Sequence, residues 1–526
     1  MKAFSQTRVF ANRHLALAGM LIILAVTGCL AASQRPNIVF ILADDLGYGD
    51  LGCYGQQKIE TPNIDRLCAD GMRFTQHYAG APVCAPSRCV LLTGKHTGHT
   101  YVRGNDEWAA RGPVWNFKAV EDDPELEGQR PIPAGTATLG ARLRSAGYAT
   151  ACVGKWGLGA PGSEGAPERQ GFDFFFGFNC QRQAHTYYPC HLYRDGQRVL
   201  TRNELVAPGT KLSPGTDPLA LASYVRFTQQ DYAPDLMFGE IRGFVNEHRA
   251  KPFFLYWATP IPHLALQAPQ RWIDHYVKKF GDEKPYDGKR GYFPQRYPHA
   301  CYAAMISYLD DQVGQLVDQL KSLGLYENTL ILFSSDNGPA NGGGTDSPWF
   351  DSARPFKSES GWGKGSLHEG GIRMPLIAVW PGHIRPGSQS DLPCAFWDLL
   401  PTFCEVAGTS APGDIDGVSL VPTLLGKQGQ RTHDYLYWEY PEAGGSQAVR
   451  LGRWKAIRSG IKKNKLCFAL YDLESDPRET TDVSAQYPDV VARVERIMRE
   501  ARVPPALDAF KLPALGDAVT TAARSP

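Results

Sequence analysis

Residues 82–94 read Pro-Val-Cys-Ala-Pro-Ser-Arg-Cys-Val-Leu-Leu-Thr-Gly, and the rest of the sequence can be interpreted outward from this stretch. Its first half is typical of a loop and its second half is apolar, which predicts a loop that runs into a helix. Pro86 suits the first helical turn, because its missing N–H would be unpaired there in any case. Cys84 would then lie at the positive end of the helix, where an anion or a polarised carbonyl group is stabilised. A buried thiol in front of an ordinary core helix is the alternative.

Four apolar runs of strand length occur elsewhere, at residues 37–43, 148–153, 253–258 and 329–335. Continuous apolar runs are typical of central parallel strands that are buried on both faces. The polar residues that follow these runs are Asp44 and Asp45, Lys155, His263, and Asp336 and Asn337. Because open α/β sheets place their sites at the carboxyl ends of the strands, we expect these residues to converge on one site.

The acidic and amide members of this set predict a site for a hard cation. Asp44, Asp45, Asp336 and Asn337 offer only oxygen ligands, which favours Ca²⁺ or Mg²⁺ over Zn²⁺. For Asp44 and Asp45 taken alone, a solvated turn is the alternative.

The motif Cys-x-Pro-Ser-Arg at residues 84–88, followed by Leu-Leu-Thr-Gly at residues 91–94, resembles the signature of the formylglycine-dependent sulfatases. These enzymes belong to the alkaline-phosphatase-like superfamily, and the resemblance extends over nearly the whole chain after residue 35. It implies that a maturase oxidises Cys84 to 3-oxoalanine (formylglycine) and that the hydrated aldehyde supplies the nucleophile. It also implies Ca²⁺ ahead of Mg²⁺ as the cation, with the modified Cys84 among its ligands.

The same resemblance implies roles for four further residues. Arg88 would polarise the modified side chain together with the cation. Lys155, in Gly-Lys-Trp-Gly, and Lys364, in Gly-Lys-Gly-Ser-Leu-His-Glu, would bind the sulfate oxygens. His263, which the prolines of Thr-Pro-Ile-Pro-His hold beyond a strand, would protonate the departing alcohol oxygen.

The sequence departs from the family pattern at Gly157, where the family usually has a histidine two residues after the lysine. This departure leaves one proton-transfer role unassigned, and His185 is a candidate replacement. His185 lies in Cys-Gln-Arg-Gln-Ala-His-Thr-Tyr-Tyr-Pro-Cys at residues 180–190. Amide, guanidinium and aromatic groups are mixed there, as in a sugar-binding wall, so we expect Gln183 and His185 to contact substrate. Core packing is the alternative for the two tyrosines.

Two polar residues after the central motif, Arg103 and Asn105, are further candidates for substrate binding, and capping of the helix end is the alternative. The chain has twelve cysteines, which allows disulfides in an oxidising compartment. Cys180 and Cys190 flank the aromatic segment and are the predicted pair, whereas Cys84 should stay unpaired.

Length and composition indicate a large globular enzyme rather than a nucleic-acid-binding or disordered protein. The chain has 526 residues and a net charge of +1, so one large domain with a smaller one is expected. We predict an α/β catalytic domain over residues 34–428, with a large, mostly parallel sheet and helices on both faces. Residues 429–526 change to short strands and a terminal helix over residues 488–502, which predicts a small antiparallel sheet with one helix. The tail beyond residue 503 is expected to be irregular or frayed.

The first 33 residues have the pattern of an export signal. Basic residues precede an apolar run at residues 15–28, which is too short for a comfortable membrane span. Val-Thr-Gly-Cys at residues 26–29 resembles a bacterial lipobox, which would make Cys29 a lipid-anchored N-terminus. Ordinary cleavage near residue 31 is the alternative. We therefore expect a periplasmic protein, an outer-membrane-attached lipoprotein or a secreted protein.

These features together predict hydrolysis of sulfate monoesters on a sulfated carbohydrate. One alternative is a phosphate or phosphonate monoester hydrolase of the same superfamily. The superfamily members of that kind generally use serine or threonine with two zinc ions, which disfavours this alternative. Another is a glycan-binding protein whose Cys84 is never matured.

Overall fold

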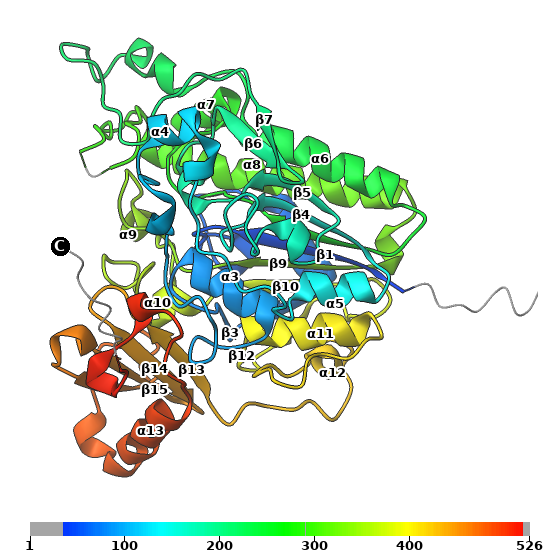
Figure 1. Ribbon diagram of the computed structural model, residues 1–526, viewed down its shortest axis with the longest axis vertical. Helices are drawn as coiled ribbons and strands as arrows, with labels where there is room; N and C mark the ends of the chain where they lie inside the picture. Colours follow the sequence, from blue (N-terminus) through cyan, green and yellow to red (C-terminus); the bar gives the residue numbers. More distant parts are fainter. Residues whose placement is uncertain (1–34, 290, 519–526) are drawn as a thin grey trace, which may run out of the picture. The chain divides into compact units, whose positions relative to one another are not determined.

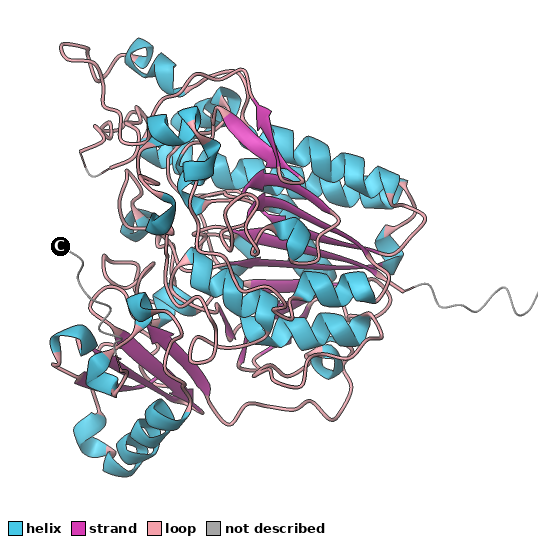
Figure 2. Ribbon diagram, viewed as in Figure 1, coloured by secondary structure: helices cyan, strands magenta, loops and turns pink. Residues whose placement is uncertain are grey.

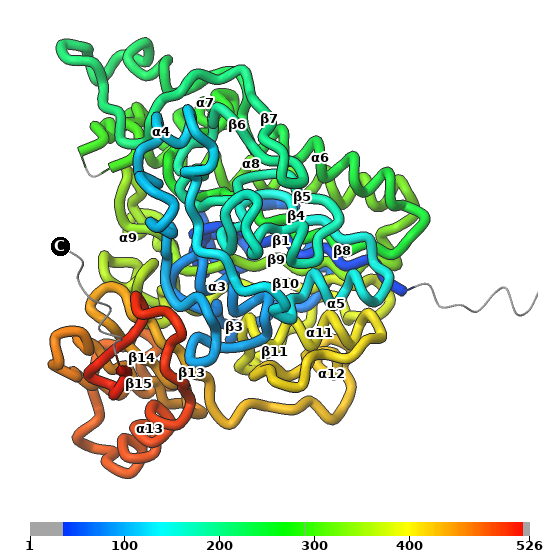
Figure 3. The backbone as a smooth tube through the Cα atoms, viewed as in Figure 1, coloured from blue at the N-terminus to red at the C-terminus, as the bar shows by residue number. Residues whose placement is uncertain are grey.

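Strand β1 (Asn37–Ala43) lies in the middle of the large sheet of the computed structural model, which describes residues 35–289 and 291–518. All seven residues of β1 are buried. It pairs in parallel with β8 (Phe253–Ala258) and β9 (Thr329–Ser335), and β8 pairs in parallel with β4 (Ala149–Lys155). The four predicted strands therefore form the parallel centre of the sheet. Their labels lie close together in Figure 3.

The pairing register brings the carboxyl ends of these strands together. Ala43 lies opposite Ser335, and Ala258 lies opposite both Leu42 and Gly154. The polar residues that follow β1, β4, β8 and β9 consequently start from the same edge of the sheet, as the sequence predicts.

The outer strands make this a ten-stranded, mostly parallel sheet with antiparallel margins, in the order β11-β2-β10-β9-β1-β8-β4-β5-β6-β7. On one side β5 is parallel to β4, whereas β6 and β7 form an antiparallel hairpin. On the other side β10 is antiparallel to both β9 and β2. The outer strands are β2 (Met72–Phe74), β5 (Phe174–Phe178), β6 (His191–Arg194), β7 (Gln197–Leu200), β10 (Leu376–Val379) and β11 (Ser388–Ser390), and β3 (His77–Tyr78) and β12 (Cys394–Ala395) form a separate parallel pair.

Helices cover both faces of the large sheet (Figures 1 and 2). Alternate side chains of β1 show why, because Val39 and Ile41 pack into one core and Phe40 and Leu42 into the other. The first core contains α2 (Pro62–Asp70), α6 (Ala233–Glu247), α7 (Gln270–Phe280) and α8 (Pro298–Ser322). The second contains α3 (Cys84–Thr93), α5 (Leu139–Ser145) and α11 (Leu399–Val406). The remaining α-helices of the large domain are short: α4 (Phe117–Asp122), α9 (Ser347–Phe350), α10 (Glu369–Ile372) and α12 (Val421–Leu424).

The C-terminal part contains the predicted antiparallel sheet with one helix. Its strands follow one another in order: β13 (Leu436–Tyr440), β14 (Ser446–Leu451), β15 (Trp454–Ser459) and β16 (Cys467–Asp472). Helix α13 (Pro488–Glu500) packs on this sheet through Val494, Ile497 and Met498. A fully buried ion pair, Lys455 Nζ to Glu369 Oε1 at 2.9 Å, joins the small sheet to the large domain.

Two expectations are corrected. The described part of the tail is irregular, as expected, apart from two short 3-10 turns, but it is not frayed, because Arg502 pairs with Asp517 at 2.7 Å and Phe510 is buried. Cys180 and Cys190 are both free thiols. Cys180 is buried, and burial followed by the charge of Glu127 raises the pKa of its thiol well above the usual range.

The predicted export signal and Cys29 lie outside the described residues. Within the described ranges, none of the helices has the length and apolar character needed to span a membrane.

Candidate active site

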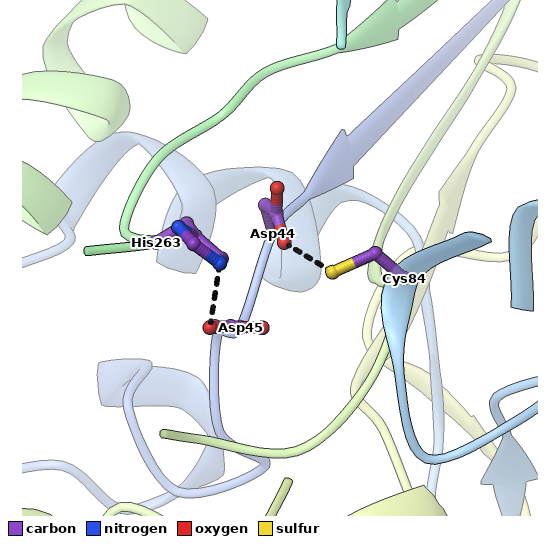
Figure 4. Close-up of side chains that lie close together, drawn as sticks. All are labelled: Asp44, Asp45, Cys84 and His263. Atoms are coloured by element: carbon purple, nitrogen blue, oxygen red, sulfur yellow. Dashed lines mark hydrogen bonds and ion pairs between the residues drawn. The ribbon is translucent and has the colours of Figure 1, made fainter. Parts of the chain in front are cut away.

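Cys84 is the first residue of α3, and its side chain lies beside the tip of β1. The thiol donates a hydrogen bond to Asp44 Oδ1 over 3.2 Å and is 2 % exposed. Figure 4 shows Asp44 and Asp45 just beyond the β1 arrow, with Cys84 approaching from the start of α3. Gly94 ends the helix at φ +68°, in the left-handed region that glycine tolerates. The predicted loop-to-helix arrangement is therefore present.

Two lysine ammonium groups flank the Cys84 sulfur. Lys155 Nζ lies 3.4 Å from the sulfur and 2.5 Å from Asp44 Oδ2. Lys364 Nζ lies 3.5 Å from the same sulfur and 2.7 Å from Asp45 Oδ1. Lys155 is the last residue of β4, whereas Lys364 comes from the long loop before α10. The sulfur therefore lies between two cations, an arrangement suited to an oxyanion bound at that point.

Arg88 lies one helical turn after Cys84 and is fully buried. Its Nε and Nη2 donate to Asp336 Oδ2 at 3.0 and 2.8 Å, and Nη2 lies 3.4 Å from Asp44 Oδ2. Its Nη1 donates to the Lys155 carbonyl oxygen. Arg88 thus ties α3 to the tips of β1, β4 and β9, and it acts on the thiol through these carboxylates.

The oxygen atoms around Asp45 fit a hard cation. Asn337 Nδ2 donates to Asp45 Oδ1 at 2.7 Å, and the Asp45 backbone N–H donates to Asp336 Oδ1 at 3.2 Å. Asn337 Oδ1 is buried and has no hydrogen-bond partner among the described residues. An unpaired buried amide oxygen is costly unless something binds it. Asp44, Asp45, Asp336 and Asn337 therefore form a donor set typical of Ca²⁺ or Mg²⁺.

Crowding of the carboxylates also favours a bound cation. Burial, followed by the charge of Asp44, raises the pKa of Asp336 to about 6. Burial also raises the pKa of Asp45, although Lys364 opposes this shift. A cation among these oxygens would offset their repulsion and favour the ionised form of both groups.

The environment of Cys84 disfavours an ordinary thiolate nucleophile. Burial, and then the charge of Asp44, raises the pKa of the Cys84 thiol despite the two lysines. The thiolate is the reactive form of cysteine, so an unmodified Cys84 would be a weak nucleophile near neutral pH.

His263 lies on the other side of Asp45, as Figure 4 shows. Its Nδ1 donates to the Leu264 carbonyl at 2.6 Å, which leaves Nε2 directed at Asp45 Oδ2, 3.7 Å away. His185 stacks on His263 with ring centroids 5.3 Å apart, and Tyr292 lies 5.3 Å from His185. Burial, followed by Lys364 and Lys155, holds the pKa of His263 well below its usual range. A bound anion would act in the opposite direction and favour the protonated ring.

The space in front of Gly157 is filled by Gln181, a residue that the sequence interpretation missed. A Cβ atom at position 157 would lie 2.9 Å from Gln181 Cγ. Gln181 Nε2 donates to Asn105 Oδ1 at 3.1 Å, and the Ala85 backbone N–H donates to the same oxygen at 3.2 Å. The only signal in the sequence for this role of Gln181 was Gly157, which stands where the family usually has a histidine. Asn105 and Gln181 thus support the first turn of α3 beside Cys84.

Two other predicted residues lie elsewhere. The Arg103 guanidinium donates to Glu439 Oε1 at 2.9 Å and to the backbone carbonyls of Thr100 and Gly98. Its charged group is thereby held between the large domain and the small sheet. Gln183 borders a small cavity that Tyr188 and His191 also line, apart from the Cys84 cluster.

Comparison with known proteins identifies the family. The sulfatase family model matches residues 36–409. The chain belongs to the sulfatase family. A second model, N-sulphoglucosamine sulphohydrolase C-terminal, matches residues 358–503. The chain is therefore a sulfuric ester hydrolase of the alkaline-phosphatase-like superfamily.

Relatives of this sulfatase are similar over most of their length. Human arylsulfatase A is 33 % identical over 517 residues, covering 90 % of this chain and 89 % of that protein. Mouse N-acetylgalactosamine-6-sulfatase is 33 % identical over 454 residues, covering 83 % and 75 % respectively. Among solved structures, Ps i-CgsB in complex with k-i-k-neocarrahexaose has a TM-score of 0.70 at 26 % identity, covering 93 % and 96 %.

The contact at Gly157 leads to a prediction with a matched control. Gly157 and Gly162 both have left-handed backbone, at φ +82° and +71°, but a Cβ at Gly162 would meet nothing within 4 Å. Gly157→Ala and Gly162→Ala are each expected to destabilise the fold by about 1–2 kcal/mol. Only Gly157→Ala should also lower kcat for sulfate release, by roughly 10- to 100-fold, because it displaces Gln181.

Thermal unfolding and initial-rate measurements on the two variants check this expectation. The double variant Gly157→Ala, Gln181→Ala lacks the Gln181 Cγ with which the new Cβ would clash. It also lacks the hydrogen bond from Gln181 to Asn105. Equal kcat values for the two alanine variants would show that Gln181 has no bearing on the active site.

Proposed function

We propose that this sulfatase hydrolyses sulfate monoesters of a sulfated carbohydrate, with Cys84 matured to 3-oxoalanine and with Ca²⁺ bound by Asp44, Asp45, Asp336 and Asn337. The observation that carries the proposal is the position of two ammonium groups within 3.5 Å of the Cys84 sulfur, beside an oxygen-rich donor set. The hydrated aldehyde would supply the attacking hydroxyl, and the cation would add positive charge at the sulfate.

Electrostatics support an anionic substrate. The carboxylates Asp44, Asp45 and Asp336 are balanced by the cations Lys155, Lys364 and Arg88. A divalent cation would leave this buried cluster with excess positive charge. A unit-charge contact at about 4 Å is worth roughly 4 kcal/mol at an effective dielectric constant of 20, so Lys155 and Lys364 can hold a sulfate monoester and stabilise charge that shifts during its cleavage.

We assign to His263 the delivery of a proton to the leaving oxygen. Its Nδ1–H is held by the Leu264 carbonyl, so the proton would be transferred at Nε2. A sugar alkoxide is a poor leaving group and requires this proton, whereas a nitrophenolate leaves without much help. His185, stacked on His263, is the candidate for the proton-transfer role that Gly157 cannot fill.

The relatives support a carbohydrate substrate. N-acetylgalactosamine-6-sulfatase is named for a sulfated sugar, and Ps i-CgsB was solved with an oligosaccharide. A screen of defined sulfated mono- and oligosaccharides for released sulfate tests the proposal, with an aryl sulfate and the matching aryl phosphate in parallel. We expect kcat/KM to be higher on the sulfate. Faster hydrolysis of the phosphate would favour the phosphatase alternative.

We also propose export from the cell, with lipidation at Cys29 or cleavage near residue 31. Globomycin sensitivity of processing distinguishes the two routes. A cytosolic, uncleaved protein would contradict both.

The leaving-group role of His263 gives a sharp prediction. His263→Ala is expected to lower kcat on a sugar sulfate by about 10²- to 10⁴-fold, the usual contribution of a general acid. On p-nitrophenyl sulfate the loss should be much smaller. His275→Ala, at a half-exposed histidine on α7, is the control and should change neither rate. Equal losses of His263→Ala on both substrates would contradict an acid role.

A further inference from the structure

The 3-10 helix η5 (Gln181–His185) forms one wall of the active site. At one end Gln181 bonds to Asn105 beside α3, and at the other His185 stacks on His263. Arg182 lies between them on the same short helix. It takes no part in the contacts that hold the catalytic cluster together, so its charge is open to another role.

Arg182 packs against two aromatic rings. Its guanidinium carbon lies 3.9 Å from the centroid of the Trp115 ring and 4.5 Å from that of Phe117. Nη2 donates to the Trp115 carbonyl oxygen at 2.8 Å. Stacking of this kind fixes the plane of a guanidinium, so that little conformational entropy is lost when it binds a further group.

The charge of Arg182 has no close carboxylate partner. Within residues 35–289 and 291–518, Arg182 forms no ion pair with an acidic oxygen within 4.0 Å, and its Nε is buried without a hydrogen-bond partner. Glu107 is the acidic residue that acts on it from further away. Burial raises the pKa of Glu107 to about 7, against the charges of Arg182 and Lys155. Glu107 therefore carries only part of a negative charge near neutral pH.

Arg182 belongs to the same electrostatic region as the catalytic cluster. After burial and His263, the charges of Lys155, Lys364 and Arg182 all contribute to the lowered pKa of His185. The Trp115 ring, on which Arg182 lies, is 58 % exposed. An exposed ring beside a polar group is a common platform for a sugar ring. A cation and an aromatic surface are thus available next to the site of sulfate cleavage.

We infer that Arg182, held on Trp115, forms a subsite for a second anionic group of the carbohydrate, either a sulfate or a carboxylate on a neighbouring position. The inference rests on the proposed function and narrows its substrate to polyanionic carbohydrates. Guanidinium groups bind both anions through paired N–H donors. Trp115 would contact the apolar face of the sugar that carries the second charge.

The test compares disaccharides that differ only in the second charge, together with an aryl sulfate that lacks the sugar. These are p-nitrophenyl sulfate, a singly sulfated disaccharide, and the same disaccharide with either a second sulfate or a carboxylate. The wild-type enzyme should have at least a tenfold higher kcat/KM on the doubly anionic disaccharides. Arg182→Gln should reduce this preference by tenfold or more, and Arg182→Lys should retain part of it. The doubly anionic disaccharide with the higher kcat/KM identifies which anion the subsite accepts.

Controls separate this subsite from folding and from catalysis. Arg111→Gln removes another arginine beside a tryptophan, one that already pairs with Glu125, and should leave the preference intact. Binding of the same disaccharides to the Cys84→Ala variant, measured by calorimetry, provides a readout without turnover. If no substrate releases sulfate, the proposed function is wrong. The inference is then decided by calorimetry, which compares disaccharide binding to the Cys84→Ala variant with and without Arg182→Gln.

Two results would overturn the inference. One is a wild-type enzyme whose kcat/KM and binding affinity are the same for singly and doubly anionic disaccharides. The other is an Arg182→Gln variant that loses the same factor on every substrate, which would indicate a structural role for the stacked arginine.

Discussion

Cys84→Ala is expected to abolish sulfate release, with kcat/KM lowered by about 10⁴-fold or more, because the variant has no nucleophile at the centre of the two lysines. The fold should survive, since the change removes one small buried group and costs about 1 kcal/mol. Cys89→Ala is the matched control. It makes the same substitution in the same helix, at a fully buried thiol in the core beneath, and it should keep activity.

Mass spectrometry of the active enzyme tests the modification itself. Trypsin should release residues 74–88 as one peptide that contains Cys84. Conversion of the thiol to an aldehyde replaces sulfur by oxygen with loss of two hydrogens, so this peptide should be about 18 Da lighter. Fully active enzyme with an unmodified thiol throughout would rule out the proposed nucleophile.

Removal of the cation is expected to have the second largest effect. Exhaustive chelation should lower kcat by about 100-fold or more, because the cluster would lose the positive charge that favours an anion, and Ca²⁺ should restore it. Ca²⁺ should also raise the melting temperature, since the three converging carboxylates bind it only in the folded chain. Activity is measured over a titration with Ca²⁺, and with Mg²⁺ in parallel.

Asn337→Ala tests which residues hold the cation. It removes the buried amide oxygen that lacks a partner, and it should shift the midpoint of the Ca²⁺ titration upward by roughly tenfold or more. Asn203→Ala, a buried asparagine bonded to the Pro189 and Asp231 carbonyls, provides a comparison for the loss of a buried amide. Full activity after chelation, at a metal content well below that of the protein, would contradict the cation's role.

The central strands were predicted closely because their signal is local. Continuous apolar runs identify β1, β8 and β9 with the bounds that the structure has, since both faces of each strand are buried. The outer strand β5 was missed, because its Phe-Phe-Phe-Gly-Phe sequence adjoins a polar, glycine-rich segment without a clear boundary. The two-residue strands β3 and β12 are too short to leave a recognisable pattern.

The candidate site was predicted in part, for a related reason. Residues directly after the central strands converge because parallel strands end at one edge of the sheet, so the meeting of Asp44, Lys155, His263 and Asp336 could be predicted from position. The roles of Lys155 and His263 depended on family resemblance. Lys364 comes from a loop, and its assignment depended on family resemblance. Arg103 was assigned to substrate because it follows the motif helix. In the structure its charge binds Glu439, 336 residues later.

The parallel core, the helix that begins at Cys84 and the oxygen-rich strand ends could be predicted from local sequence, because burial and backbone conformation depend on neighbouring residues. Which side chains meet across long loops depends on the folded chain as a whole. Gln181 fills the space at Gly157 and supports α3 through Asn105, and Arg182 stacks on Trp115 instead of pairing with an acid. Such pairings depend on the registry of distant segments, which no local pattern encodes.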